Sequence, residues 1–367
     1  MSKHIVIDAR DYSSTTGRYI RSIISNLEKI DNKNNYTILV LPKSDADYIP
    51  KAKNFKKKLA PFNKFSLSEQ VKFGAFLKQL RPDLVHFAST TQPIFYNKLK
   101  VTTIHDLTPL RFNLAVGKLS RITYPLKKKL LNLMLYRAGK KSAIVFTGTD
   151  YVKQDLINNL GVSASKIVVT SESADAIKEI PKKINQLYKK PFIFYVGRAQ
   201  AHKNINGLLL AFKKIQQNNS KVMLVLAGKK DLAYQHIENL VKKQNIRNVV
   251  FTDYVSEGQL HWLYKNCLAY VFPSFSEGFG LPGLEAMVHG APLVSSNATC
   301  LPEVYKDSAL YFNPNNVNDI ALKIDRIIRD NQLRNTLIVK GKKHVLLYSW
   351  TQSSKQVLNE YNKLLKI

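Results

Sequence analysis

The amino-acid sequence predicts an α/β protein built from two doubly wound parallel-sheet domains that face each other across a cleft. Its 367 residues are too many for one hydrophobic core and suit two domains. Short apolar runs alternate with helical patterns along nearly the whole chain, which is typical of parallel strands covered by helices. The alternation breaks once, over the polar residues 173–190 around Pro181, and then restarts.

The first half of the chain carries six apolar runs that predict strands. Between them, apolar residues at helical spacing from Ile20 to Ile30, and three further stretches, predict helices. The predicted strands cover residues 5–7, 36–41, 84–87, 101–104, 143–147 and 166–170, and the further helices cover 66–80, 118–138 and 150–159.

The second half repeats this pattern, with predicted strands at 192–196, 222–226, 249–251, 268–272 and 292–294. Three helical segments close the chain, the last of them after Trp350. We expect a first domain over residues 1–175 and a second over 188–347. In sheets of this kind, ligands bind outside the carboxyl ends of the strands, so the site is expected there.

Composition narrows the possible functions. With 45% hydrophobic and 22% charged residues the chain is not disordered, and 56 Lys+Arg against 26 Asp+Glu leave a net charge of +30. Such a charge favours a polyanionic neighbour, or reflects a lysine-rich proteome. Few of the basic residues are arginine, the residue that reads DNA bases, so an anionic membrane surface is favoured over nucleic acid. Two lysine clusters are candidates for lipid contact or are solvated basic faces: Lys51, Lys53, Lys56, Lys57 and Lys58, and Lys127–Lys129.

Other residues argue against a metal centre or a membrane span. Cys267 and Cys300 make neither a disulfide framework nor a zinc set, which fits a reducing compartment. Asp45-Ala46-Asp47 lies in a polar loop and is expected to be exposed. No apolar run is long enough to cross a bilayer. We expect a cytoplasmic protein, soluble or peripheral on the inner face of the cell membrane, with no metal and no cofactor.

The most informative segment is the glycine-rich stretch that follows the predicted strand 268–272 and opens a helix. Gly278 and Gly280 allow close approach of the backbone, Pro282 suits a first helical turn, and the helix start offers N–H groups to a phosphate. Glu277 and Glu285 are placed to face one pocket. Three interpretations compete: a dinucleotide fingerprint, a solvated turn, and a nucleotide-sugar site. The fingerprint requires an acid after the next strand, and none follows residues 292–294.

Several motifs in order along the chain resemble the large retaining glycosyltransferase family four. Glu277 to Glu285 resembles its Glu-x7-Glu motif. The other matching segments are 7–19, 103–110, 194–204 and 251–256. The resemblance implies the GT-B fold, two Rossmann-like domains with a final helix, here about 350–367, that crosses back to the first domain. The chain departs from the family pattern at Thr15-Thr16, at Asp253, and at Ser171-Glu172-Ser173, where Pro-Asn-Gly is typical.

The resemblance also implies roles for single residues. Arg198 and Lys203, which would otherwise be solvated loop charges, would neutralise the donor diphosphate, and Glu285 would bind its ribose. Glu277 and His105 are the catalytic candidates, although His105 is also a candidate for a buried structural histidine. The donor-binding set is completed by Gly17, Gly278, Phe279, Gly280 and Leu281.

The sequence thus predicts a retaining, metal-independent hexosyltransferase of the mannose or glucose type. Its donor would be a GDP- or UDP-linked sugar, and its acceptor a hydroxyl of a glycan or lipid-linked molecule in cell-surface polysaccharide or glycolipid synthesis. The leaving phosphate would assist transfer on the face it departs from. One alternative is a nucleic-acid or anionic-membrane binding protein on a Rossmann-like scaffold, although no specific nucleic-acid motif is present. Another is a GT-B phosphorylase or sugar-nucleotide epimerase.

Overall fold

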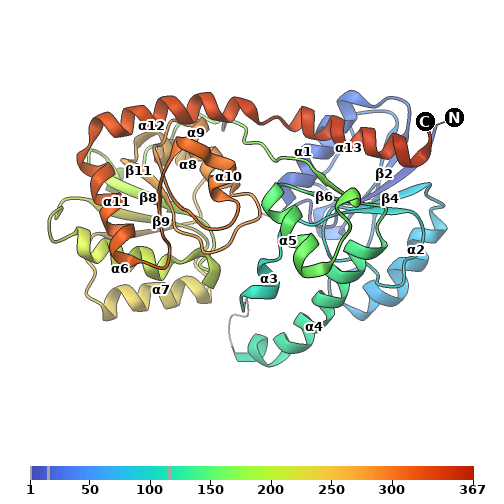
Figure 1. Cartoon of the computed structure of the whole chain (residues 1–367), viewed down its shortest axis with the longest axis horizontal. Helices are drawn as coiled ribbons and strands as arrows, with labels where there is room; N and C mark the ends of the chain where they lie inside the picture. The colour runs from blue at the N-terminus through green and yellow to red at the C-terminus, as the bar shows by residue number, and fades with distance from the viewer. Residues whose placement is uncertain (1, 15–16, 114–117) are drawn as a thin grey trace. The chain divides into compact units, whose positions relative to one another are not determined.

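The computed structural model describes residues 2–14, 17–113 and 118–367. The chain forms two compact units (Figure 1). Unit 1 consists of residues 1–110, 122–172 and 349–367, and unit 2 consists of residues 111–121 and 173–348. Each unit contains one parallel β-sheet with helices packed on it, as the alternation of strand and helix patterns predicts.

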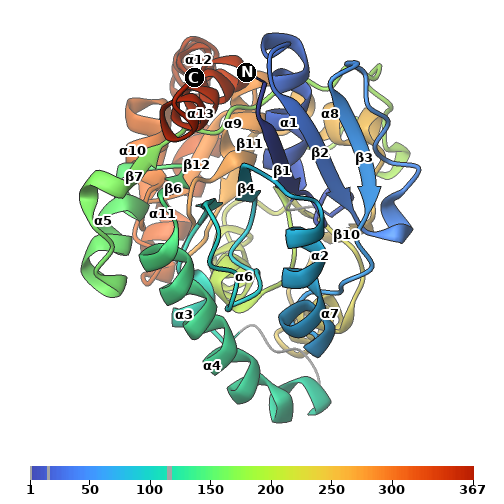
Figure 2. The same ribbon diagram turned by 90° about the vertical axis from the view of Figure 1, so that its right-hand side faces the viewer.

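The described residues of unit 1 form a seven-stranded sheet in the order β3-β2-β1-β4-β5-β6-β7, and Figure 2 shows β1, β2 and β3 side by side. Chain order therefore reverses between β1 and β4. The strands are β1 (His4–Asp8), β2 (Asn35–Val40), β3 (Phe55–Leu59), β4 (Leu84–Phe87), β5 (Lys100–Thr103), β6 (Ile144–Thr147) and β7 (Ile167–Val169). The helices are α1 (Arg18–Ile30), α2 (Gly74–Gln79), α3 (Thr108–Arg111), α4 (Lys118–Lys141), α5 (Asp150–Leu160) and α13 (Trp350–Leu365), with a π-helical turn, η3 (Glu69–Phe73), before α2; the end of α3 and the start of α4 are counted with unit 2.

Alternation along β1 supplies the unit 1 sheet with two hydrophobic faces. Ile5 and Ile7 belong to a core shared with α1 and with Trp350, Val357 and Tyr361 of the last helix. Val6 points to the other face and packs in a core with η3 and α2. Since successive residues of a strand point to opposite faces, one short apolar strand holds helices on both sides of the sheet.

The unit 2 sheet has six strands in the order β10-β9-β8-β11-β12-β13 over the described residues, so chain order reverses between β8 and β11. The strands are β8 (Phe192–Val196), β9 (Met223–Ala227), β10 (Val249–Asp253), β11 (Ala269–Phe272), β12 (Leu293–Ser296) and β13 (Ala309–Phe312). The helices are α6 (Ile205–Ile215), α7 (Leu232–Lys243), α8 (Glu257–Asn266), α9 (Leu281–Val288), α10 (Leu301–Tyr305), α11 (Val317–Arg329) and α12 (Asn331–His344).

Two strands lie outside the sequence prediction, and both are edge strands. β3 reads Phe-Lys-Lys-Lys-Leu, which lacks the alternation of a half-buried strand, and it pairs only with β2 within the described residues. Phe55 anchors it by stacking on Tyr36 at 4.2 Å between ring centroids. Lysines on an edge strand are a common protection against pairing with other chains. β13 is four residues long and forms one edge of the unit 2 sheet, where it pairs with β12.

Asp45 and Asp47 are exposed as expected, and their side chains contact Lys57 and Ser13. Both cysteines are buried and free. Within the described ranges, no helix has the length and apolar character needed to cross a membrane.

Candidate functional site

The predicted donor residues of unit 2 lie on the two loops that leave β8 and β11. These strands are neighbours at the point where chain order reverses, which is where open α/β sheets bind ligands. The loop after β8 carries Arg198 and Lys203, and the loop after β11 carries Glu277 to Gly280.

Lys203 and Glu277 form an ion pair across these two loops. The Nζ of Lys203 lies 2.7 Å from Oε1 of Glu277, and the two side chains are 19% and 12% exposed. The ammonium also lies 5.7 Å from the ring centroid of Phe272. The interpretation of Lys203 as a solvated loop charge is therefore wrong, because its charge is largely removed from water and paired.

Asn204 fixes the backbone beside Lys203. It has a positive φ of 53°, a conformation that asparagine tolerates better than most residues, and its side chain caps α6 through the N–H of Gly207. Its Nδ2 donates to the carbonyl oxygens of Pro273 and Pro314, at 3.1 and 3.0 Å. Asn204 thus ties the Lys203 loop to the end of β11. Asn204 lies in the segment 194–204 that resembles a family motif, but only its contacts in the structure identify its role as a link between loops.

Two buried polar atoms on these two loops lack a hydrogen-bond partner among the described residues: Nδ1 of His202 and Oγ of Ser274. The two side chains are 7% and 0% exposed. Burial, helped by the charge of Lys203, lowers the pKa of His202 to about 4, so its ring is neutral. Buried polar atoms normally have partners, so these two fit a site that binds a polar ligand.

Gly280 shapes the start of α9 by its conformation. It adopts φ of 92°, and a Cβ there would lie 2.4 Å from the hydroxyl of Tyr305, which donates to the Gly280 carbonyl. Glycine is required here because the backbone has a positive φ and because a Cβ would overlap the Tyr305 side chain. Pro282 stands in the first turn as predicted, and no described side chain caps the helix. The first N–H groups of α9 are therefore available to donate to a bound anion or to backbone carbonyl oxygens.

The remaining donor candidates of unit 2 have different neighbours. Glu285 accepts from the Tyr264 hydroxyl at 3.3 Å, so the two glutamates have different partners. Arg198 is exposed, and its carbonyl oxygen accepts from Tyr195. Phe279 is 5% exposed and packs edge-on against Tyr348, which is the position of a core residue. Gly278 is buried and Leu281 half-buried in the same segment.

Two candidates, Gly17 and His105, belong to unit 1. Gly17 precedes α1 and donates its N–H to the Ser14 carbonyl, and a Cβ on it would lie 2.1 Å from the Asp11 carbonyl oxygen. His105 follows β5, and its Nδ1 lies 3.3 Å from Oε1 of Glu172. In the sequence, Glu172 stands out only as a departure from the family pattern, and its contact with His105 depends on strands far apart in the chain.

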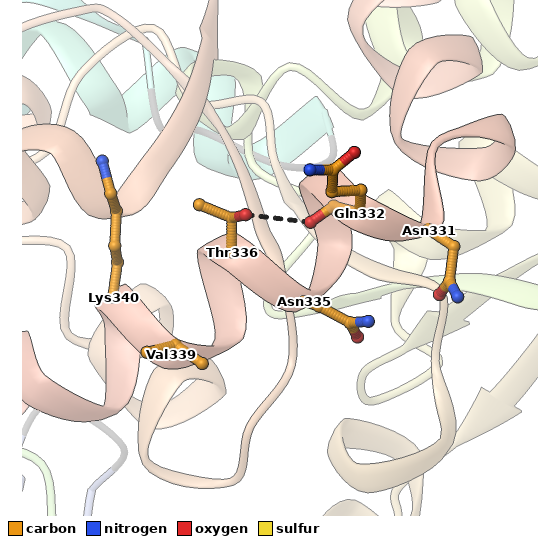
Figure 3. A pocket seen from close by; sticks show the side chains of 6 residues that line it. All are labelled: Asn331, Gln332, Asn335, Thr336, Val339 and Lys340. Carbon is orange, nitrogen blue, oxygen red and sulfur yellow. Dashed lines mark hydrogen bonds between the residues drawn. The ribbon is translucent and has the colours of Figure 1, made fainter.

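A pocket elsewhere on unit 2 does not overlap this site. Figure 3 shows a shallow pocket along one exposed face of α12, where Thr336 Oγ1 donates to the Gln332 carbonyl at 2.9 Å. Its lining contains none of the predicted site residues; it consists of Asn331, Gln332, Asn335, Thr336, Val339 and Lys340. Over residues 2–14, 17–113 and 118–367, no three His, Cys, Asp or Glu side chains gather as a metal site would require.

Comparison with known proteins identifies the family. The model of glycosyltransferase family 4 matches residues 17–175, and the model of glycosyl transferases group 1 matches residues 176–344. The O-antigen chain mannosyltransferase B of Escherichia coli is 31% identical over 277 residues, which are 72% of this chain and 70% of that protein. The O-antigen chain mannosyltransferase RfbU of Salmonella typhimurium is 31% identical over 225 residues, 60% of this chain and 62% of the relative.

Solved structures give the same fold. The sucrose-phosphate synthase of Thermosynechococcus elongatus superposes with a TM-score of 0.79 at 19% identity, covering 99% of both chains. HepE of Anabaena, solved in complex with UDP and glucose, gives a TM-score of 0.73 at 15% identity and covers 99% of this chain and 100% of its own. With two parallel doubly wound sheets and family models that together run from residue 17 to 344, the chain belongs to glycosyltransferase family 4 and has the GT-B fold.

Proposed function

We propose that this glycosyltransferase moves a hexose of the mannose or glucose type, with retention of configuration, from a nucleotide-diphosphate sugar to a hydroxyl of a glycan or lipid-linked acceptor. The product belongs to cell-surface polysaccharide or glycolipid synthesis, as the relatives that are O-antigen chain mannosyltransferases suggest. The observation that carries the proposal is the largely buried Lys203–Glu277 pair at the point where strand order reverses in unit 2.

Each donor residue has a role that its chemistry supports. Lys203, with Arg198 and the N-terminal turn of α9, neutralises the diphosphate. Glu285 accepts hydrogen bonds from the ribose hydroxyls, as acidic residues do in dinucleotide sites. Glu277 binds the sugar hydroxyls and is paired with the Lys203 ammonium. His202 and Ser274 supply buried polar atoms that a bound donor satisfies.

The reaction breaks the bond between the anomeric carbon and the oxygen of the distal phosphate, whose electron pair leaves with the nucleoside diphosphate. The acceptor oxygen forms the new bond on the same face, and its proton passes to the departing phosphate oxygen. Cationic and N–H donors aimed at the leaving group stabilise the charge that develops there. We propose that these groups do this without a metal and that no cofactor takes part.

The donor is UDP- or GDP-linked in this proposal, and a thermal-shift screen of UDP, GDP, ADP and their common sugars tests it. A ligand at a hundredfold its Kd should add about 2.7 kcal/mol to the free energy of unfolding. One base should stabilise the wild type and fail to stabilise Glu285→Ala. A transfer assay with the same donor, read by NMR of the anomeric proton, tests retention. No stabilisation by any nucleotide would overturn the proposal.

We also propose that unit 1 contacts an anionic membrane surface, which places the enzyme on the inner face of the cell membrane. In the first lysine cluster, Lys57 is paired with Asp45 at 2.6 Å, whereas Lys51, Lys53, Lys56 and Lys58 are exposed. A better surface combines exposed apolar side chains with exposed lysines on η3, α4 and the segment between β4 and β5. We call it the apolar-basic surface, and it consists of Leu67, Val71, Lys72, Phe95, Lys127, Lys129, Leu133 and Tyr136.

Contacts within unit 1 join the three parts of the apolar-basic surface. The N–H of Ile94 donates to Gln70 of η3, and Arg137 of α4 donates to the Ile94 carbonyl. Exposed Val71, at 73%, and Phe95, at 67%, therefore lie on adjoining segments. Apolar side chains among lysines favour binding to anionic lipid.

Sedimentation with phosphatidylglycerol vesicles tests the membrane proposal. Wild type should bind at low salt and less at high salt. Val71→Asp combined with Phe95→Asp should abolish binding, while Leu322→Asp, a change at an exposed leucine of α11, should not. Absence of binding at low salt would overturn the membrane role and leave the transferase proposal untouched. Nucleic-acid binding rests on net charge alone and is not favoured by the family.

A further inference from the structure

A histidine and a glutamate meet at the carboxyl edge of the unit 1 sheet. His105 follows β5, Glu172 follows β7, and β6 lies between these strands. Oε1 of Glu172 lies 3.3 Å from Nδ1 of His105. The histidine side chain is 32% exposed and the glutamate side chain 12%, so the carboxylate lies in the protein and the ring reaches the surface.

The neighbours of the ring restrict it further. Tyr19 packs edge-on against it, with ring centroids 5.0 Å apart and planes at 82°. The Tyr19 hydroxyl is held by Thr103 at 3.3 Å, and Thr103 in turn lies 2.8 Å from Nε2 of the buried His86. The ring of His105 therefore stands between a fixed aromatic edge and a carboxylate, which leaves it little rotational freedom.

We infer that Glu172 is a positioning residue that accepts a hydrogen bond from the Nδ1–H of His105, orients the ring toward the substrate and favours its protonated, hydrogen-bond-donating form. The inference rests on the proposed function, in which His105 contacts the transferred sugar or the acceptor. It gives a role to a residue outside the Glu-x7-Glu motif.

Electrostatics around the ring agree with this geometry. Burial alone would lower the pKa of His105, but the hydrogen bond and charge of Glu172, the charge of Asp106 and the Ala88 carbonyl outweigh it, so the pKa is raised. His86 packs nearby, and burial lowers its pKa to about 3, so it adds no second positive charge. Tyr19 stays neutral because burial raises its pKa to about 12.

The direct test is the pKa of His105 itself, measured by NMR on protein with 13C-labelled histidine, with the His105 signal assigned from its loss in His105→Gln. Glu172→Gln should lower the proton affinity of His105 about tenfold or more. Glu172→Asp should restore part of it. Glu257→Gln, a change at an exposed glutamate of α8, should leave the titration unchanged. An unchanged His105 titration in Glu172→Gln would overturn the inference.

Kinetics separate a positioning role from a merely structural one. Because a raised pKa keeps the ring charged until the pH passes that pKa, the alkaline fall of kcat/KM in Glu172→Gln should move to lower pH by the shift that NMR measures. The Kd for the nucleoside diphosphate should not change. A uniform loss at every pH would refute positioning. If the NMR shift occurs but wild type transfers no sugar from any donor, the proposed function fails while the pairing stands.

Discussion

The Lys203–Glu277 pair predicts that one of two substitutions at the same contact will weaken nucleotide binding and the other will not. Lys203 is the cation proposed to meet the diphosphate, and Glu277 is an anion that holds it at 2.7 Å. Lys203→Met removes a charge-assisted hydrogen bond to phosphate, worth about 1.5–3 kcal/mol. Nucleoside diphosphate binding should therefore weaken by about 10- to 150-fold.

Glu277→Gln should not weaken binding of the same ligand. It removes a carboxylate that competes for the ammonium and repels the phosphates. At an effective dielectric constant near 20, a like charge some 8–10 Å away costs about 2 kcal/mol before screening by salt, so the Kd for UDP or GDP should stay equal or fall by up to about tenfold. Sugar transfer should nevertheless be lost, because Glu277 is proposed to bind the sugar.

Isothermal titration calorimetry with UDP and GDP, which lack the sugar, measures both effects. The matched control is Lys340→Met, which breaks an exposed lysine–aspartate pair at 2.8 Å in the same unit. Its Kd should match that of wild type within about twofold, since exposed pairs are worth little. If Glu277→Gln weakened UDP and GDP binding as much as Lys203→Met does, Glu277 would serve to position Lys203 and the electrostatic argument would be refuted.

Three further predictions concern stability. Gly280→Ala should lower the free energy of unfolding by about 2–4 kcal/mol through positive φ and steric overlap, whereas Gly74→Ala, where a Cβ would meet only Pro93 at 3.7 Å, should not; urea denaturation compares them. Arg10 forms a buried salt bridge with Glu69 at 2.8 Å. Arg10→Met should lower the free energy of unfolding by about 3–5 kcal/mol because it leaves the Glu69 carboxylate buried and unpaired, and a urea midpoint equal to that of wild type would contradict this. The folded-state pKa of His86 is about 3, below its ordinary value near 6.5, so its contribution is complete above pH 6.5 and is lost as the pH falls toward 3. Between pH 4 and 6, His86→Gln should reduce the slope of unfolding free energy against pH by up to about 1.4 kcal/mol per pH unit, and equal slopes for wild type and variant in urea denaturation over that range would disprove it.

The arrangement of strands and helices was largely readable from the sequence, because it depends on local periodicity. Buried parallel strands read as short apolar runs, and helices as a repeat of about 3.6 residues. β3 was not predicted because its three consecutive lysines lack the apolar run of a buried strand. Phe55 anchors it through stacking on Tyr36 of the neighbouring strand β2. Edge strands have fewer neighbours to satisfy, so their sequences carry a weaker signal.

For the candidate site, too, part could be read from the sequence and part depended on the tertiary structure. The sequence by itself indicated the candidate residues on each loop, because glycine, proline, glutamate and lysine at those spacings are properties of a continuous segment. Only the tertiary structure decided their partners: Lys203 with Glu277, Asn204 with Pro273, and His105 with Glu172. These partners are 67 to 74 residues apart in the chain. They meet because parallel strands bring their carboxyl ends to one edge of a sheet, which no local pattern records.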